Sequence, residues 1–249
     1  MDAQQPRIAL LIDADNAPAA KIDLVLTEVA RYGVANVRRA YGNWKSPHLR
    51  GWEAVLHEYA IRPIQQFAYS SGKNASDMAM VIDAMDLLYA RNLDGFAIVS
   101  SDADFTPLVM RLLTDGVRVY GFGEQKTPAP FVNACSKFIY VEALGATQAG
   151  DAGGPSATRK DEKALRGDTR LVQLLRGAVD AESEDDGWAH LGAVGKQIAN
   201  QASLDPRNYG YRKLSDLVRA IGLFEIRQDE KTLWVRVKQK RAPAKKPQA

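Results

Sequence analysis

The sequence predicts an α/β domain built on a mostly parallel sheet, followed by a smaller domain of winged helix-turn-helix type. Three observations predict this arrangement. Short β-rich runs alternate with helical patterns up to residue 144, which is typical of a parallel sheet with helices on both faces. A stretch rich in Gly, Ala, Ser and Thr begins near Gly145 and indicates a flexible linker. Beyond it, three helical patterns precede two short strands, as in a winged helix-turn-helix.

Apolar runs bounded by turn residues define the elements of the first domain. Strands are expected at residues 7–13, 34–42, 61–69, 95–101, 117–123 and 137–141. Helices are expected at residues 18–33, 47–60, 76–91, 104–116 and 129–135. Gly116 is a usual C-terminal stop for the fourth of these helices. In such a fold we expect the functional residues beyond the carboxyl ends of the strands.

The second domain has helical patterns that end in a strand pair. Helices are expected at residues 169–182, 189–202 and 209–222, and strands at 223–228 and 232–238. The chain therefore divides into a domain at residues 1–144, a linker at 145–167, a second domain at 168–237 and a basic tail at 238–249.

Composition excludes several classes of protein. Of the 249 residues, 46% are hydrophobic and 25% are charged, and no apolar run approaches the roughly 20 residues that span a bilayer. Cys135 is the only cysteine, which excludes an intrachain disulfide and a cysteine-based zinc site. With no visible secretory signal, a lone thiol suits a cytoplasmic protein. The net charge of +3 is uneven, −2 over residues 1–147 and +5 over residues 148–249, which suggests an acidic site and a polyanion-binding module.

Aspartates follow two of the buried strands. Asp13 ends the first strand and is followed by Asp15 and Asn16, and Asp102 and Asp104 follow the strand at 95–101. Because parallel strands end at the same edge of the sheet, we expect these carboxylates to lie close together. One aspartate after a strand is unremarkable, but two Asp-x-Asp clusters after two buried strands indicate a site.

A third contribution comes from the helix predicted at residues 76–91. Asp77 lies in its first turn, on the apolar face that points toward the sheet, although a favourable interaction with the helix dipole would also explain it. Asp83 lies on the flank of this helix and is expected to be a satisfied polar residue or a supporting partner. Clustered carboxylates stay ionised at neutral pH only around a cation. Oxygen ligands alone favour Mg²⁺ or Mn²⁺, which suits metal-dependent phosphoryl chemistry.

The segments IALLIDADN, AYGNW, KNASDMAMVIDAM and IVSSDADFTPLVMRLLTDGVRVYGFG resemble the NYN domain, a PIN-like ribonuclease fold, in its LabA-like branch. The resemblance covers about residues 7–144 and implies a three-layer PIN-like sheet. It maps Asp13, Asp77, Asp102 and Asp104 onto the metal ligands or their close supports, and Asn16 onto the polar residue of the first motif. Ser101 stands where the family commonly has Gly, a departure that does not touch the carboxylates.

The second domain resembles the LOTUS domain, also called OST-HTH. The segments GWAHLGAVGKQI, NYGYRKLSDLVRAIGLFEI and LWVRVK carry the resemblance, over about residues 168–237. It implies binding to RNA, including G-rich structured RNA, or docking to a protein partner. The two resemblances together imply a nuclease directed at RNA.

A nuclease of this kind must hold a polyanion beside its acidic pocket. Basic and polar residues near the predicted site, and aromatic residues that could stack on exposed bases, are candidates for that role. The candidates for RNA contact are Asn16, Arg39, Tyr41, Trp44, Lys45, Lys73, Asn74 and Ser101 in the first domain, and Arg212 and Lys213 in the second. Strand packing is an equally good explanation for Tyr41, whereas the loop around Trp44 favours contact.

The expected reaction is hydrolysis of an RNA phosphodiester by metal-activated water, with Asp13 and Asp102 as central ligands and Asp77 and Asp104 completing the site. Two alternatives remain. One is a haloacid-dehalogenase-like phosphatase, because Asp13-Ala14-Asp15 resembles the nucleophile motif of that family. However, Ala17 stands where that family needs Thr or Val, and Ser70 and Lys73 fill its other motifs poorly. The other alternative is a non-catalytic RNA-binding adaptor with a vestigial acidic site.

Overall fold

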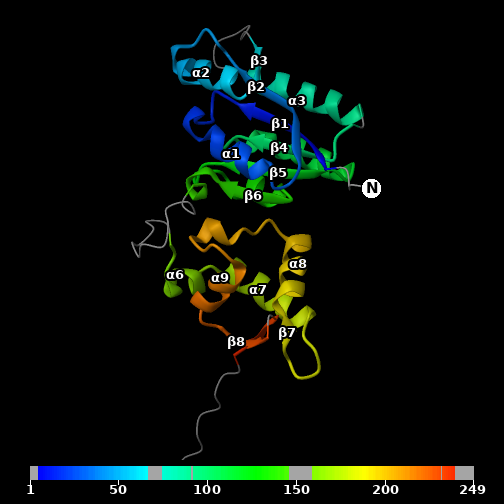
Figure 1. The fold of residues 1–249 in the computed structure, drawn as a ribbon, viewed down its shortest axis with the longest axis vertical. Coiled ribbons are helices and arrows are strands. Elements are labelled where there is room, and N and C mark those ends of the chain that lie inside the picture. Colours follow the sequence, from blue (N-terminus) through cyan, green and yellow to red (C-terminus); the bar gives the residue numbers. More distant parts are fainter. Residues whose placement is uncertain (1–4, 67–74, 91, 146–158, 231, 239–249) are drawn as a thin grey trace, which may run out of the picture. The chain divides into compact units, whose positions relative to one another are not determined.

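A computed structural model describes residues 5–66, 75–90, 92–145, 159–230 and 232–238 (Figure 1). These residues form two compact units, and each is described by itself. The first takes in residues up to 145 together with Ala202–Asn208, and the second takes in residues 159–201 and 209–238. No helix in the described ranges is long and apolar enough to cross a membrane.

A six-stranded sheet forms the centre of the first unit. Its strands are β1 Arg7–Asp13, β2 Val34–Gly42, β3 Arg62–Gln65, β4 Gly95–Val99, β5 Arg118–Gly123 and β6 Lys137–Tyr140. The strand order is β3-β2-β1-β4-β5-β6, and every neighbouring pair is parallel. The chain therefore runs outward from β1 to β3 and then returns to place β4 on the other side of β1. The ends of β1 and β4 mark the point where the winding reverses, which is where open parallel sheets bind their ligands.

Helices cover both faces of this sheet. The α-helices are α1 Ile22–Val29, α2 Arg50–Glu58, α3 Ala75–Tyr89, α4 Thr106–Thr114 and α5 Ala129–Ala134. Short 3₁₀ turns lie at η1 Ala19–Lys21, η2 Pro47–Leu49, η3 Ala103–Phe105 and η4 Val141–Ala143. The α/β class with helices on both faces, predicted from the alternation of elements, is confirmed.

The alternation of side chains along β1 explains how the two faces are filled. Ile8, Leu10 and Ile12 pack with the buried residues of α1 and α2. Ala9 and Leu11 point the other way and pack with α3, α4 and α5. All five residues are buried, because β1 lies in the middle of the sheet and is covered on both sides. This covering fixes the end of β1, and with it Asp13, in a rigid part of the fold.

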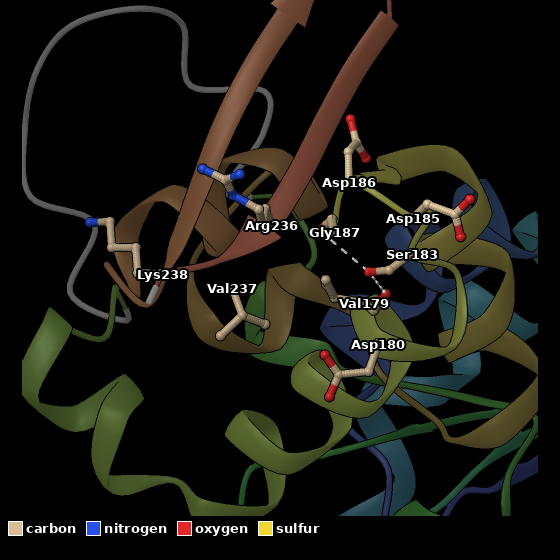
Figure 2. A pocket seen from close by; sticks show the side chains of 9 residues that line it. All are labelled: Val179, Asp180, Ser183, Asp185, Asp186, Gly187, Arg236, Val237 and Lys238. Carbon is tan, nitrogen blue, oxygen red and sulfur yellow. Dashed lines mark hydrogen bonds between the residues drawn. The ribbon is translucent and has the colours of Figure 1, made fainter. Parts of the chain in front are cut away.

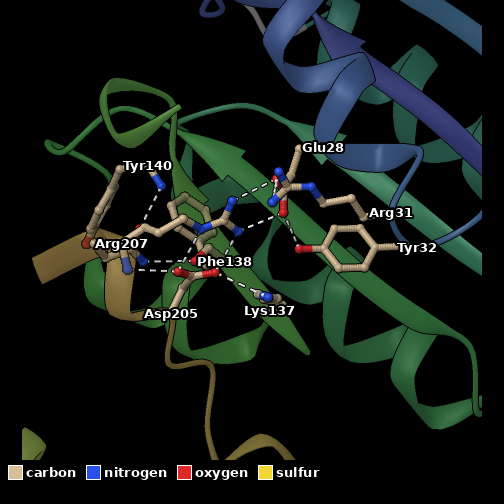
Figure 3. A network of polar contacts seen from close by, with 9 residues as sticks. Glu28, Arg31, Tyr32, Lys137, Phe138, Tyr140, Asp205 and Arg207 are labelled. Atoms are coloured by element: carbon tan, nitrogen blue, oxygen red, sulfur yellow. Dashed lines mark hydrogen bonds and ion pairs between the residues drawn. The ribbon is translucent and has the colours of Figure 1, made fainter. Parts of the chain in front are cut away.

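A buried ion network lies at the β6 side of the same unit (Figure 3). Arg207 donates two hydrogen bonds of 2.7 Å to the carboxylate of Glu28 and three further bonds, one of them from its main-chain N–H, to Asp205. Lys137 lies 3.2 Å from Asp205. Burial alone would raise the pKa of Glu28 and Asp205, but the bonds from Arg207 outweigh it and hold both pKa values below their ordinary range.

The second unit consists of helices and a small antiparallel sheet. Its elements are α6 Glu162–Gly167, α7 Thr169–Ala181, β7 Ala189–His190, α8 Leu191–Gln201, α9 Leu214–Ala220, β8 Phe224–Asp229 and β9 Thr232–Val237. The 3₁₀ turn η5 Pro206–Tyr209 separates α8 from α9. The sheet order is β7-β9-β8. The three helices and the strand pair of the predicted winged helix-turn-helix are present, with α6 added before them.

Helix α6 corrects the end of the predicted linker. The composition predicts a flexible linker at residues 145–167, but residues 162–167 are helical. The Asp161 carboxylate accepts a hydrogen bond from the main-chain N–H of Ala164, and Leu165 is fully buried. A cap and one apolar anchor therefore order this stretch, which its polar composition concealed. Residues 146–158 of the predicted linker, and the predicted tail after Lys238, lie outside the described residues.

Candidate active site

Asp13 is the buried centre of the site. It is the last residue of β1, and only 1% of its surface is exposed. Its carboxylate accepts hydrogen bonds from the hydroxyl of Ser100 at 2.7 Å and from the side-chain amide of Asn16 at 2.9 Å. Burial raises the pKa of Asp13 above its ordinary value, and these two hydrogen bonds oppose the rise. A carboxylate held in this way has a fixed position and a charge that is costly to leave unbalanced.

Ser100 joins Asp13 to the second group of aspartates. It follows the last residue of β4 and is buried. Its hydroxyl donates to Asp13 and accepts a hydrogen bond of 3.0 Å from the main-chain N–H of Asp102. Asp102 in turn caps the turn η3 by accepting from the main-chain N–H of Asp104 at 2.9 Å. The two strand ends are thus connected through one buried hydroxyl group.

Asp77, in the first turn of α3, is the third contribution to the site. Its pKa is raised to about 6, first by burial and then by the negative charges of Asp13, Asp102, Asp15 and Asp104. The negative charges of these four aspartates therefore act on the Asp77 carboxyl through space. The hydroxyl of Ser76, the residue before Asp77, donates to Asp15 at 2.8 Å and ties the start of α3 to the loop after β1.

Five aspartates concentrate negative charge in this part of the first unit. No Lys or Arg of the described ranges lies within ion-pair distance of Asp13, Asp77 or Asp102. In the same ranges, no three His, Cys, Asp or Glu side chains are close enough together to hold a metal ion as they stand. The side chains thus supply the hard oxygen donors that Mg²⁺ and Mn²⁺ prefer, but not a closed coordination shell.

The prediction that Tyr41 stacks on RNA bases is wrong. Tyr41 lies on β2 and only 1% of its surface is exposed, because its ring packs in the core on the α3 side of the sheet. Its hydroxyl donates to Asp83 of α3, and Arg39 forms an ion pair with the same carboxylate. Arg39 was also predicted to contact RNA, but Asp83 offsets its charge. Asp83 is therefore a satisfied partner between strand and helix, one of the two roles considered for it.

The other residues of the first unit that were predicted to contact RNA differ in their exposure and in their hydrogen bonds. Trp44 is half-buried against the core, and its indole N–H donates to the main-chain carbonyl of Ile64 at 3.0 Å. Lys45 beside it is exposed. The hydroxyl of Ser101 accepts a hydrogen bond from the main-chain N–H of Glu124 and so links two loops. Asn16 is exposed but directs its amide to Asp13.

Two further candidates, Lys73 and Asn74, lie outside the described residues. In the second unit, Arg212 and Lys213 are both exposed just before α9. Leu217 and Val218 of the same helix are buried. Arg212 and Lys213 thus remain available for contact with a ligand.

Sequence reasoning missed the two serines that organise the site, Ser76 and Ser100. Ser100 had a detectable signal, since a polar residue directly after a buried strand and two positions before an Asp is placed to bond across the sheet edge. The sequence offers two adjacent serines there, and the pattern alone does not tell which hydroxyl turns inward.

Comparison with known families decides what this arrangement is. The NYN domain matches residues 7–142, more than half of the chain, and the OST-HTH/LOTUS domain matches residues 166–235. The chain belongs to the NYN domain family. NYN domains are part of the PIN-like nuclease superfamily, whose members generally use divalent metal ions, and an OST-HTH/LOTUS domain indicates RNA binding. This NYN chain therefore pairs a nuclease-family domain with an RNA-binding domain.

The individual proteins that this chain matches are uncharacterized or of unknown function, so they do not indicate an activity. An uncharacterized protein of Methanocaldococcus jannaschii, MJ0482, is 30% identical over 124 residues, which are 48% of this chain and 48% of that protein. The NYN chain thus spans about half the length of this relative. A protein of unknown function from Vibrio parahaemolyticus, VPA0982, is 18% identical with a TM-score of 0.47, over 56% of this chain and 95% of that one. An uncharacterized protein of Nitrosomonas europaea, from locus NE0665, is 30% identical with a TM-score of 0.27, over 38% of this chain and 94% of that one.

Proposed function

We propose that this NYN protein is a metal-dependent endoribonuclease that hydrolyses RNA phosphodiester bonds at Asp13, Asp77, Asp102 and Asp104. The observation that carries the proposal is the buried Ser100 hydroxyl, which bonds both to Asp13 at the end of β1 and to the main chain of Asp102 after β4, while the charges of both aspartates raise the pKa of Asp77. Carboxylates cost free energy when they are brought together without a cation, so a fold that gathers them has a use for one.

The donor set fits Mg²⁺ or Mn²⁺. Its members are carboxylate oxygens, with no His or Cys among them, and hard divalent cations prefer such ligands. Such a cation, when bound, lowers the pKa of a water molecule and offsets the charge that develops on a phosphodiester. Asp13 and Asp102 are the central ligands in this proposal, and Asp77 and Asp104 complete the set.

The residues around the carboxylates keep them in position. Ser100 and Asn16 fix the orientation of the Asp13 carboxylate through hydrogen bonds, and Ser100 also holds the main chain at Asp102. Asp77 stands at the start of a helix whose apolar face is buried, so its position is set by packing. Pre-positioned groups of this kind need little rearrangement when a substrate arrives.

The substrate-holding surface is proposed from exposure and charge. The candidates are the exposed Lys45 and the half-buried Trp44 in the first unit, and the exposed Arg212 and Lys213 in the second. Lys and Arg side chains bind the phosphate backbone with little regard to sequence, which suits a nuclease that must accept single-stranded or G-rich structured RNA. A protein partner for the OST-HTH/LOTUS domain is the other possibility.

The test is a cleavage assay on a circular RNA, which only an endonuclease can open. We expect cleavage with Mg²⁺ or Mn²⁺, loss of cleavage with a chelator, and no cleavage by Asp13→Asn or Asp102→Asn. The Asp86→Asn variant is a matched control because Asp86 is exposed on α3 and also loses one charge. Equal cleavage by both site variants and the wild type would refute the mechanism. Tight RNA binding without cleavage in either metal would instead identify a non-catalytic adaptor.

A further inference from the structure

The outward face of the small sheet in the second unit carries an unusual set of side chains. Side chains alternate between the two faces of a strand. Ala189 of β7 and Val235 of β9 point inward and are fully buried. Their neighbours therefore point outward, and His190, Trp234 and Arg227 lie side by side in register across β7, β9 and β8. Trp234 thus occupies a position in this row where a polar residue would be sufficient for folding.

A second tryptophan joins the row. Trp188 precedes β7 by one residue, so it shares the outward direction of His190. The guanidinium carbons of Arg236 and Arg227 lie 4.6 and 4.7 Å from the centre of the Trp188 ring, and Arg227 lies 5.9 Å from that of Trp234. His190 meets Trp234 edge to face at 5.8 Å. We call Trp188, His190, Arg227, Trp234 and Arg236 the tryptophan face.

The tryptophan face combines accessible rings with available positive charge. Both tryptophans are only half-buried, and His190 and Arg227 are exposed. Arg236 is paired with Glu225 at 2.5 Å, whereas Arg227 has no carboxylate within ion-pair distance among the described residues. Arg227 instead lies against the rings of Trp188 and Trp234. In sequence, β9 continues into the acid-free run KQKRAPAKKPQA, which adds positive charge to this end of the chain.

A hollow of about 470 Å³ adjoins the face at Arg236 (Figure 2). Arg236 and Lys238 line it together with Asp180, Asp185 and Asp186. The Nε of Arg236 is buried and lacks a hydrogen-bond partner within the described part of the chain. A phosphate has only acceptors and would be repelled by the aspartates. The edge of a nucleobase has both donors and acceptors, and it suits a hollow lined by basic side chains and carboxylates together.

We propose that the tryptophan face binds unpaired bases of single-stranded RNA by stacking on Trp234, with Arg227 supplying charge for the backbone. Exposed aromatic rings next to arginine are the means by which proteins bind unpaired bases. The inference rests on the proposed function only in taking RNA as the ligand, and it places the main contact on the sheet instead of Arg212 and Lys213.

The test measures binding of a fluorescent, unstructured single-stranded RNA to the full chain. All proteins carry Asp13→Asn, so that the ligand is not cleaved. We expect Trp234→Ala and Arg227→Ala each to weaken binding about tenfold, given the usual contribution of a stacked base. Trp234→Phe should keep most of the affinity because it keeps a ring. Arg219→Ala is the matched control, since Arg219 is an exposed arginine of α9 that is not part of the tryptophan face, and this variant should bind as before.

Several outcomes decide the matter. RNA should quench the tryptophan fluorescence, and Trp234→Phe should lose the part of this quenching that comes from Trp234. That result supports stacking. Unchanged RNA affinity in both Trp234→Ala and Arg227→Ala overturns the proposal, as does equal competition by duplex RNA. Arg227→Ala keeps the test decisive if Trp234→Ala fails to fold, because Arg227 is a surface residue. Cleavage of circular RNA by the wild type is scored separately, so a binding face without nuclease activity would refute only the proposed enzyme.

Discussion

Replacing Asp77 by Asn should have opposite effects on stability with and without metal. Burial and the charges of neighbouring aspartates raise the pKa of Asp77 to about 6, from its ordinary 3.8. A raised pKa in an acid means that the folded state disfavours the ionised form. At pH 7 the carboxylate is ionised and therefore destabilises the metal-free protein, and the neutral amide of Asn removes this cost.

The magnitude follows from the change in pKa. A rise in pKa from 3.8 to about 6 corresponds to about 3 kcal/mol in the free energy of unfolding if solvent does not screen the interaction. Asp77 is only half-buried, so solvent screening reduces this to about 1–2 kcal/mol. Between pH 3.8 and 6 the folded protein binds more protons at this site than the unfolded protein does. The free energy of unfolding of the wild type therefore falls as the pH rises through this range. The advantage of Asp77→Asn should therefore be full at pH 7 and absent below pH 3.8.

The assay is thermal unfolding of the full chain in chelator and again in Mn²⁺. In chelator at pH 7, Asp77→Asn should melt at a higher temperature than the wild type. In Mn²⁺ the wild type should gain stability and Asp77→Asn should gain much less, because a ligand is lost. Asp86→Asn should match the wild type in both conditions. The reasoning is refuted if Asp77→Asn is less stable in chelator, or if Mn²⁺ stabilises both proteins equally.

Two further predictions concern hydrogen bonds that position buried carboxylates. Ser100→Ala removes the hydroxyl that connects Asp13 with the main chain of Asp102, and cleavage should fall roughly 10–100-fold while RNA affinity is kept. Kinetics within twofold of the wild type would argue against this role. Arg207→Ala leaves Glu28 and Asp205 buried without their main partner, and the free energy of unfolding at pH 7 should drop by about 3–5 kcal/mol. Because the pKa values of these two acids are lowered, the stability they confer is present above their ordinary pKa values and is lost as the pH falls. Denaturant titrations of wild type and variant should thus differ strongly at pH 7 and converge in acid, and equal curves at pH 7 would contradict the argument.

The aspartates of the candidate site could be proposed from local sequence patterns. The side chains that hold them through hydrogen bonds could not. An aspartate at or shortly after the end of a buried strand can be recognised from the apolar run before it, so Asp13 and Asp102 could be proposed from the sequence. The choice between Ser100 and Ser101 was not, because it depends on which hydroxyl turns toward the neighbouring strand. The burial of Tyr41 depends on α3, which brings Asp83 to meet the hydroxyl from 42 residues further along the chain.

The sequence by itself determined the order of strands and helices, the two family resemblances and the gathering of aspartates at strand ends, because hydrogen-bonding periods and turn residues act over a few positions. Only the tertiary structure decided that Arg39 is neutralised by Asp83, that Ser100 links the two strand ends, and that Trp188 and Trp234 share one face. Such contacts join residues far apart in the chain, and they are set by the register of the strands and by which side chains must be buried.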